Sequence, residues 1–330
     1  MNLFISLFVV VVLVLLVMVG AGVADLQFVF GVIVPYAAIA IFLLGFVYRV
    51  LKWARSPVPF RIPTTCGQQK SLPWIKSNNL ENPHTTWGVL GRMALEVLFF
   101  RSLFRNTKVE LRNGPRLIYG ANKFLWAGGL AFHWSFLVIF IRHFKFFAEP
   151  VPSWVLAAQN LDGFFQVGLP IIYITDVVIV AALTYLFFRR VVSPQMRYIS
   201  LANDYFPLLL LLGVVLSGVL MRYFFKTDIA GVKELGMGLL SFNPVVPEGV
   251  GVMFYIHLFL VSVLFAYFPF SKLMHMAGVF LSPTRNLVNN NRMRRHINPW
   301  DYPVKVHTYE EWEDEFRDVM KAADMPLEKE

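Results

Sequence analysis

The sequence has a single cysteine and few charged residues. Of its 330 residues only Cys66 is a cysteine and 15% are charged, whereas 57% are hydrophobic. One cysteine excludes a disulfide framework, a cysteine-ligated iron–sulfur cluster and a covalently attached c-type haem, and the chain has no C-x-x-C-H motif. A soluble domain has roughly 25% charged residues. The composition therefore predicts a membrane protein in which other side chains hold any redox centre.

Long apolar runs are what the sequence has in abundance. Each of six stretches is long enough to cross a bilayer, which takes about 20 residues. Only helices suit such runs, because lipid offers backbone groups no hydrogen-bond partner. The first run lacks a basic n-region, so we expect it to be retained, although small residues in VMVGAGVADL would permit cleavage. The predicted spans are 3–24, 28–48, 122–146, 167–188, 205–225 and 250–271.

Positive charge lies almost entirely on one side of these spans. All but five of the thirty Lys and Arg residues fall on that side, the exceptions being Arg142, Lys145, Arg222, Lys226 and Lys233. Since Lys and Arg concentrate in cytoplasmic loops, we predict that both termini are cytoplasmic in a multi-pass cell-membrane protein. The basic charge then reflects topology, and we expect no nucleic-acid partner.

Two segments outside the spans are long. The loop 49–116 holds WGVLGRMALEVLFFRSLF (87–104), which mixes apolar and charged residues and predicts a helix on the membrane surface or against a partner. The tail 286–330 ends in the acidic YEEWEDEFRDVMKAADMPLEKE. This tail is either a solvated helix or a docking arm for a cytoplasmic subunit.

Four of the seven histidines lie within just two predicted spans. His133 and His143 are in the third span, and His257 and His275 are in the sixth. These two spans are antiparallel in the predicted topology, so His133 can face His275 on the inner side and His143 can face His257 on the outer side. The remaining three, His84, His296 and His307, belong to cytoplasmic segments, where we expect surface positions.

Helix geometry tests this pairing in part. At about 1.5 Å per residue, the histidines are separated by roughly 15 Å in the third span and roughly 27 Å in the sixth. Eighteen residues are five full turns, so His257 and His275 share a face of a straight helix, whereas ten residues leave His133 and His143 roughly 80° apart. The levels match only if a helix tilts or bends.

The pattern favours two bis-histidine b-type haems over other histidine roles. A lone membrane histidine more often hydrogen-bonds another helix, but two facing pairs are harder to explain in that way. No carboxylate or cysteine is spaced to complete another kind of metal site. We therefore predict an all-α membrane protein: two N-terminal transmembrane helices (1–48), the loop 49–116, a di-haem bundle of four to five helices (117–285) and the tail 286–330.

The two histidine spans also carry a family resemblance. HWSFLVIFIRH (133–143) and HLFLVSVLFAYFPFSKLMH (257–275) resemble the His-x9-His and His-x17-His helices of the di-haem cytochrome b family typified by the respiratory nitrate reductase gamma subunit. GVLGRMALEVLFFRSLFRNTK and the added N-terminal helix resemble its DsrM-type branch, from the sulfite-reduction-associated Dsr complex. The resemblance covers about 117–285. It implies that His133 and His275 ligate the inner haem iron.

The resemblance implies that His143 and His257 ligate the outer haem iron and that quinone chemistry takes place beside that haem. Menaquinone is then the lipid-soluble redox partner, and a cytoplasmic iron–sulfur subunit of the heterodisulfide reductase-like DsrK type is the soluble one. Further membrane and periplasmic Dsr subunits would complete a complex of dissimilatory sulfur metabolism. The family's catalytic lysine near the quinol site has no aligned motif in this chain. The chain is an electron-transfer subunit in this interpretation, because it holds no complete site for a soluble substrate.

Charged residues near the outer ends of the spans are the candidates for the quinone site. Arg142, Lys145 and Asp176 could contact a quinone, and Arg222 could contact a haem propionate. Anchoring of the cations at the membrane interface is the alternative interpretation. Asp176 lies inside a span, which suggests a proton path or a polar contact.

Two other classes of function remain open at this point. A proton-coupled transporter could use the four histidines and Asp176 as a relay, and a purely structural anchor would need none of them. The transporter lacks support from internal repeats or from interrupted spans in matching positions.

Overall fold

The computed structural model describes residues 2–56, 67–104, 108–165, 171–294, 303 and 306–329. The start of the predicted fourth span and parts of the predicted loop and of the predicted tail lie outside these residues, as do Cys66 and His296. Within the described residues the chain is mostly helical.

Five helices are long and apolar enough to cross a membrane. They match five of the six predicted spans. A sixth helix, α7 (Ile174–Val192), stands where the fourth span is predicted but begins later and is not one of the five. Its 19 residues include Asp176, Arg189 and Arg190, so its composition alone does not mark it as a span. The five are α1 (Asn2–Gly22), η1 with α2 (Val29–Ala54), α5 with η2 (Lys123–Phe146), α9 (Ala202–Tyr223) and α11 with η3 (Val252–Phe270).

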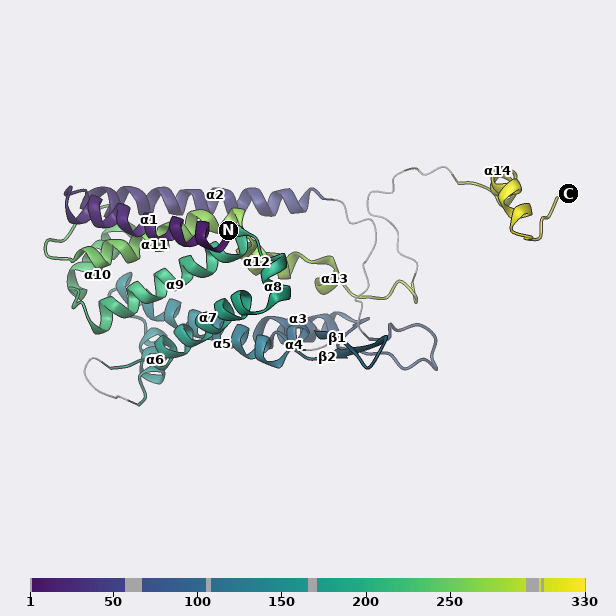
Figure 1. Ribbon diagram of the computed structural model, residues 1–330, viewed down its shortest axis with the longest axis horizontal. Helices are drawn as coiled ribbons and strands as arrows, with labels where there is room; N and C mark the ends of the chain where they lie inside the picture. The colour runs from purple at the N-terminus through teal and green to yellow at the C-terminus, as the bar shows by residue number, and fades with distance from the viewer. Residues whose placement is uncertain are drawn as a thin grey trace.

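The long helices lie side by side in an elongated bundle (Figure 1). α9 packs against α1, α11 and α7, while α5 packs against α7, and α2 packs against α11 on the other side. α2 and α7 end, and α5 and α9 begin, at one end of the bundle. We call this the basic end, because Arg49, Arg189 and Arg190 lie there. Short helices α6 (Ser153–Asp162) and α10 (Ile229–Leu240) lie at the opposite end.

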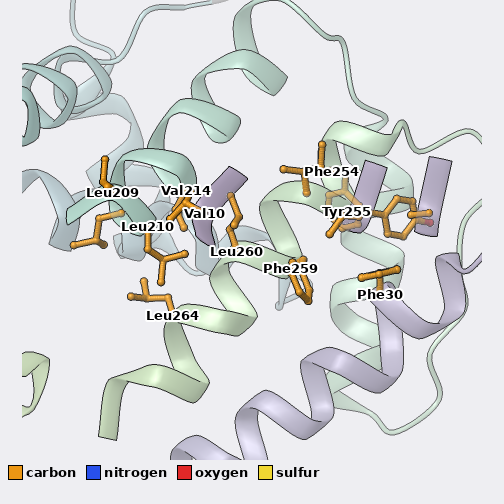
Figure 2. Packing of buried hydrophobic residues seen from close by; sticks show 14 of the residues in the cluster. Val10, Phe30, Leu209, Leu210, Val214, Phe254, Tyr255, Phe259, Leu260 and Leu264 are labelled. Atoms are coloured by element: carbon orange, nitrogen blue, oxygen red, sulfur yellow. The ribbon is translucent and has the colours of Figure 1, made fainter. Parts of the chain in front are cut away.

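The core of the bundle lies where α1, α9, α11 and the start of the α2 segment meet. Buried side chains from these four segments interdigitate in Figure 2, where Phe30 meets Phe259 edge to face with ring centres 5.4 Å apart. Leu210 and Leu260 are almost fully buried. Each buried leucine or phenylalanine contributes about 1.5–3 kcal/mol relative to an exposed position in a water-soluble protein. In lipid the same contacts act mainly through close packing.

The last predicted span is broken rather than straight. α11 (Val252–Tyr267) gives way to η3 (Phe268–Phe270), η4 (Lys272–Met274) and α12 (His275–Leu281). Pro269 cannot donate a backbone hydrogen bond, and Ser271 is extended, with φ −114° and ψ 179°. The expectation that His257 and His275 share one face of a continuous helix is therefore wrong. The break supplies the bend that the mismatched histidine levels require.

A folded segment covers the basic end. It contains α3 (Thr86–Phe99), which begins where the Thr85 hydroxyl accepts a hydrogen bond from Gly88 N at 3.2 Å, and α4 (Arg101–Phe104). The predicted helix 87–104 is thus divided by one residue, Phe100. We call residues 67–104 and 282–294, which pack together, the cap.

A small β-hairpin follows the cap and corrects the all-α prediction. β1 (Lys108–Arg112) pairs with β2 (Arg116–Gly120) in antiparallel register, with Val109 opposite Tyr119. Its turn places Asn113 and Gly114 at positive φ, which suits those residue types. The remaining helices are α8 (Pro194–Ile199), α13 (Pro283–Asn286) and the tail helix α14 (Tyr309–Ala322).

Candidate functional site

The four span histidines form two pairs, one near each end of the bundle. Near the basic end, the rings of His133 and His275 have centres 5.9 Å apart and planes at 84°. Near the opposite end, the rings of His143 and His257 have centres 6.3 Å apart and planes at 18°. We call these the first and the second pair. They are the pairs that the antiparallel topology predicts to face each other.

In each of these four imidazoles, Nδ1 donates a hydrogen bond to a backbone carbonyl. His133 Nδ1 donates to Gly129 O at 2.7 Å and His143 Nδ1 donates to Ile139 O at 2.7 Å, each within α5. His275 Nδ1 donates to Lys272 O at 3.0 Å. Since Nδ1 carries the proton, Nε2 of each neutral ring keeps its lone pair, which is the state of a metal-ligating histidine.

His257 has a further polar contact. Its Nδ1 donates to Val214 O of α9 at 3.0 Å, and Ser217 Oγ lies 3.0 Å from the same atom. Gly218 permits this approach, because a Cβ there would lie 3.2 Å from His257 Cε1. The second pair is therefore held by α9 as well as by its own helices.

The spacing of both pairs fits a metal ion between the rings. An imidazole nitrogen binds a metal at about 2 Å and the ring centre lies about 1 Å farther, so two opposed ligands place their ring centres about 6 Å apart. Among the described residues no cluster of three or more His, Cys, Asp or Glu side chains could hold a bare metal ion. Two imidazoles per site suit a haem, because the macrocycle supplies the iron's other four ligands.

Two aromatic side chains pack against His133 of the first pair. The rings of Phe100 and Phe132 each stand edge to face with the His133 ring, with centres 4.8 Å away in both cases. Phe132 is the neighbour of His133 in α5, but Phe100 comes from the cap. It has φ 50° and ψ 45°, in the left-handed region where glycine is the usual residue at the end of a helix.

Ion pairs tie the cap together near the first pair. Glu96 of α3 is buried and accepts from Arg285 of α13 at 2.8 Å and from Ser102. Arg92 donates to the carbonyl of Arg285 and is 3% exposed. Burial and the neighbouring Arg285 guanidinium lower the pKa of Arg92, because both disfavour its charged form. Arg101 adds a link to Glu81 at 2.7 Å.

A second buried network stands next to His143. The Arg142 guanidinium pairs with Asp162 of α6 and with Asp176 of α7 at 3.2 Å. All three are at most 9% exposed. Thr175 N and Oγ1 donate to Asp162 at 2.8 and 2.6 Å, and Tyr223 Oη donates to Asp176 at 2.7 Å. The Arg142 side chain is thus the centre of a network that joins α5, α6, α7 and α9.

The other predicted outer cations have different surroundings. The Arg222 guanidinium lies 4.1 Å from the centre of the Tyr173 ring, over which Arg142 also lies at 3.6 Å, and it donates to Ile171 O at 3.1 Å. Lys145 Nζ donates to Gln159 at 3.3 Å. Among the described residues Lys145 has no carboxylate within ion-pair distance.

Sequence reasoning missed several members of these networks. Phe100, Asp162 and Tyr223 have no motif, and Ser217 resembles any other serine of an apolar helix. Asp162 could have been found by asking which carboxylate compensates Arg142, since a buried guanidinium requires one. A polar contact was one of the two roles suggested for Asp176, and in the structure this carboxylate pairs with Arg142 and accepts from Tyr223.

The chain is similar to known proteins over most of its length. Residues 84–295 match the family model described as nitrate reductase gamma subunit. A protein of Archaeoglobus fulgidus named Hdr-like menaquinol oxidoreductase cytochrome b-like subunit is 49% identical over 280 residues, which cover 83% of each chain. A protein of the same name from Archaeoglobus profundus is 40% identical over 274 residues, which cover 81% of each chain. Residues 84–295 contain all four span histidines and the cap from residue 84 onward.

Proposed function

The chain belongs to the nitrate reductase gamma subunit family, and on that premise we propose that it is the membrane cytochrome b subunit of a menaquinol-linked oxidoreductase, with two b-type haems. The relatives' name, Hdr-like menaquinol oxidoreductase cytochrome b-like subunit, supports the quinone link and membership of a multi-subunit complex. We assign the chain to the DsrM-type branch of the family, with a role in dissimilatory sulfur metabolism.

The observation that carries the proposal is the geometry of the two histidine pairs. Both ring-centre distances, 5.9 and 6.3 Å, suit ligands on opposite sides of one metal ion. Every Nδ1 is bonded to a carbonyl, so every Nε2 is available. His133 with His275 would hold one haem iron, and His143 with His257 would hold the other.

A bound haem supplies one-electron transfer between a hydrophobic quinol and a one-electron carrier. The residues of this chain supply position and electrostatics. The carbonyls of Gly129 and Ile139 orient the two α5 imidazoles, and the rings of Phe100 and Phe132 pack against the His133 ring.

The proposed topology has six spans, with α7 as the fourth. α7 packs between α5 and α9, so a bilayer around those two helices would also surround α7. The charge of Arg142 is compensated by the Asp176 carboxylate inside the bundle. The concentration of Lys and Arg supports a cytoplasmic basic end and cytoplasmic termini. The first pair would then lie on the cytoplasmic side.

Menaquinol would be oxidised near the second pair. Among Arg142, Lys145 and Asp176, the structure ties the first and the third to each other, so their charges already compensate. Within the part of the chain that the structure describes, the neutral Gln159 amide is the only hydrogen-bond acceptor of Lys145. We therefore take Lys145 as the group that contacts the quinol oxygen and Arg142 with Asp176 as the rigid wall behind it. Arg222, held by the Ile171 carbonyl and stacked on Tyr173, remains the candidate for a propionate contact.

The cytoplasmic partner would be an iron–sulfur subunit of the heterodisulfide reductase-like DsrK type, with further Dsr subunits in the membrane and beyond it. The tail helix α14 supports a protein partner. It is acidic, yet Tyr309, Trp312, Phe316 and Val319 form an exposed apolar stripe at helical spacing. An anionic membrane surface repels such a helix, whereas a groove with basic residues at its rim attracts it.

The test is haem analysis of the purified full-length chain. A pyridine haemochrome should show two protohaems per chain, and His133→Ala and His257→Ala should each lose one of them. His307→Ala, outside the spans, is the matched control and should keep both. A chain with no protohaem would support the anchor or the transporter, and full haem content in both alanine variants would refute the assigned ligands.

The quinone assignment needs its own measurement. Lys145→Met should lower the rate at which a menaquinol analogue reduces the haems, while dithionite still reduces both completely. Lys233, paired with Glu149 at the same end of the bundle, provides the control Lys233→Met. An unchanged quinol rate in Lys145→Met would remove Lys145 from the quinone site.

A further inference from the structure

Phe100 occupies a backbone position that a phenylalanine disfavours. Its φ of 50° lies in the left-handed region, which strains a residue with a bulky side chain but which glycine adopts readily. Such a residue persists only where the surrounding contacts compensate for the strain. The end of α3 would form more easily with glycine, so the ring itself needs an explanation.

Two indole groups hold the backbone on one side of Phe100. Trp134 Nε1 donates to Leu98 O at 3.0 Å, and Trp126 Nε1 donates to Phe99 O at 2.7 Å. Both tryptophans belong to α5, on either side of His133 in sequence. They satisfy carbonyls that the end of α3 would otherwise leave without partners and join that end to α5.

The other side of Phe100 is linked through Glu96 to α13, the helix that follows the one carrying His275. Ser102 N donates to Glu96 at 3.3 Å, and Glu96 pairs with Arg285 at 2.8 Å. Arg285 lies in α13, which follows α12, and α12 begins with His275. The turn at Phe100 is therefore connected to both members of the first pair.

We propose that the cap positions the first haem-ligand pair, with the Phe100 ring setting the plane of the His133 imidazole. This inference rests on the proposed function, because it concerns ligands assigned there. The plane of the Phe100 ring lies at 84° to that of the His133 ring, so Phe100 blocks rotation of the imidazole on one side. The plane of the Phe132 ring lies at 76° to the same imidazole. The Gly129 carbonyl fixes the Nδ1 position. Together these contacts maintain the near-perpendicular arrangement with His275.

The angle between two axial imidazoles has a spectroscopic signature. Perpendicular planes leave two iron d orbitals nearly equal in energy, so an oxidised low-spin haem gives a strongly anisotropic EPR signal. Nearly parallel planes separate these orbitals and give a rhombic signal with a smaller largest g value. The first pair, at 84°, should give the first kind of signal, and the second pair, at 18°, should give the second kind.

Phe100→Gly removes the aromatic ring but keeps the backbone turn, so it tests the role of the ring alone. Glycine fits the backbone at least as well, so the fold and the two-haem content should be retained. The anisotropic signal should shift to a smaller largest g value and the midpoint potential of that haem should change, while the rhombic signal stays as in the wild type. Phe100→Tyr keeps the ring and should restore the original signal.

Phe242 provides a matched control. It also has a left-handed backbone, with φ 57°, but it stacks on Tyr36 at 5.8 Å and contacts none of the four histidines. Phe242→Gly should leave both EPR signals and both potentials unchanged.

The outcomes separate this inference from the proposed function. Two haems with unchanged EPR signals in Phe100→Gly would overturn the role of Phe100 and leave the haem assignment intact. If Phe100→Gly loses a haem, Phe100→Leu decides, because it keeps apolar bulk without an aromatic edge: a shifted anisotropic signal supports the inference and an unchanged one overturns it. A wild-type chain without protohaem would refute the proposed function itself.

Discussion

The two histidine pairs use the same chemistry in different surroundings. In the first pair His133 and His275 are exposed on the bundle surface, and elements outside the spans contact them: the end of α3 and the break after α11. In the second pair His143 and His257 are half-buried, and carbonyls of α5 and α9 orient them. The first pair thus depends on the cap, and the second pair depends on the packing of the long helices.

This difference suits the two ends of an electron-transfer subunit. A pair at the surface, with contacts to a folded cap, can respond to a soluble partner that docks there. A pair inside the bundle, beside a buried ion network, remains fixed while a lipid-soluble carrier exchanges. These contacts indicate that the two pairs are held independently of each other.

Removal of one histidine from each pair should give the largest effect. We expect His275→Ala to abolish the anisotropic EPR signal and His257→Ala to abolish the rhombic one, because in the proposed function each pair would supply both axial ligands of one iron. Loss of the same signal in both variants would contradict two separate pairs. Low-temperature EPR of the oxidised proteins, normalised to haem content, is the measurement.

Loss of the buried guanidinium should have the next largest effect, confined to the second pair. Arg142→Leu leaves Asp162 and Asp176 without their shared partner, and breaking a buried ion pair costs about 3–5 kcal/mol. The midpoint temperature of thermal unfolding in detergent should fall strongly. The rhombic EPR signal should broaden, while the anisotropic signal should stay unchanged.

The exposed pair of Lys233 with Glu149 is the comparison for that variant. Lys233→Ala should cost about 0–1 kcal/mol, because surface ion pairs contribute little. Equal destabilisation by the two variants would show that the Arg142 network does not support the second pair.

Weakening of the cap should affect the first pair with an intermediate cost. Glu96→Gln keeps the shape but removes the charge that Arg285 meets, and a hydrogen bond to a charged group contributes about 1.5–3 kcal/mol. The anisotropic signal should become heterogeneous while the rhombic one is unaffected. If the rhombic signal changed instead, the cap would act on the second pair, and the prediction would be contradicted.

The smallest effect should follow from Ser217→Ala in α9. His257 Nδ1 keeps the Val214 carbonyl and loses only the hydroxyl contact, so the cost should be about 0.5–1.5 kcal/mol. Redox titration should show a small change in the potential of the second haem alone. Ser262→Ala, five residues after His257 on α11 and bonded to Leu258 O, serves as the control.

Much of this architecture could be predicted from local pattern. Apolar runs of about 20 residues indicated the spans, since lipid leaves no other backbone solution, and five of the six coincide with helices that could cross a membrane. The histidine spacings indicated which rings could face each other in antiparallel helices. The hairpin after the cap and the division of the helix 87–104 were not predicted, because neither has a strong periodic signal.

The sequence by itself determined that the chain is a bundle of apolar helices with four histidines in two of them, because span length and residue spacing are local properties. Only the tertiary structure decided that α11 breaks before His275, that Phe100 meets His133 from 33 positions away, and that Asp162 and Asp176 share Arg142. The physical reason is that these contacts join segments distant in sequence. Their partners are set by how helices pack, and no periodicity in one segment records which side chain of another will reach it.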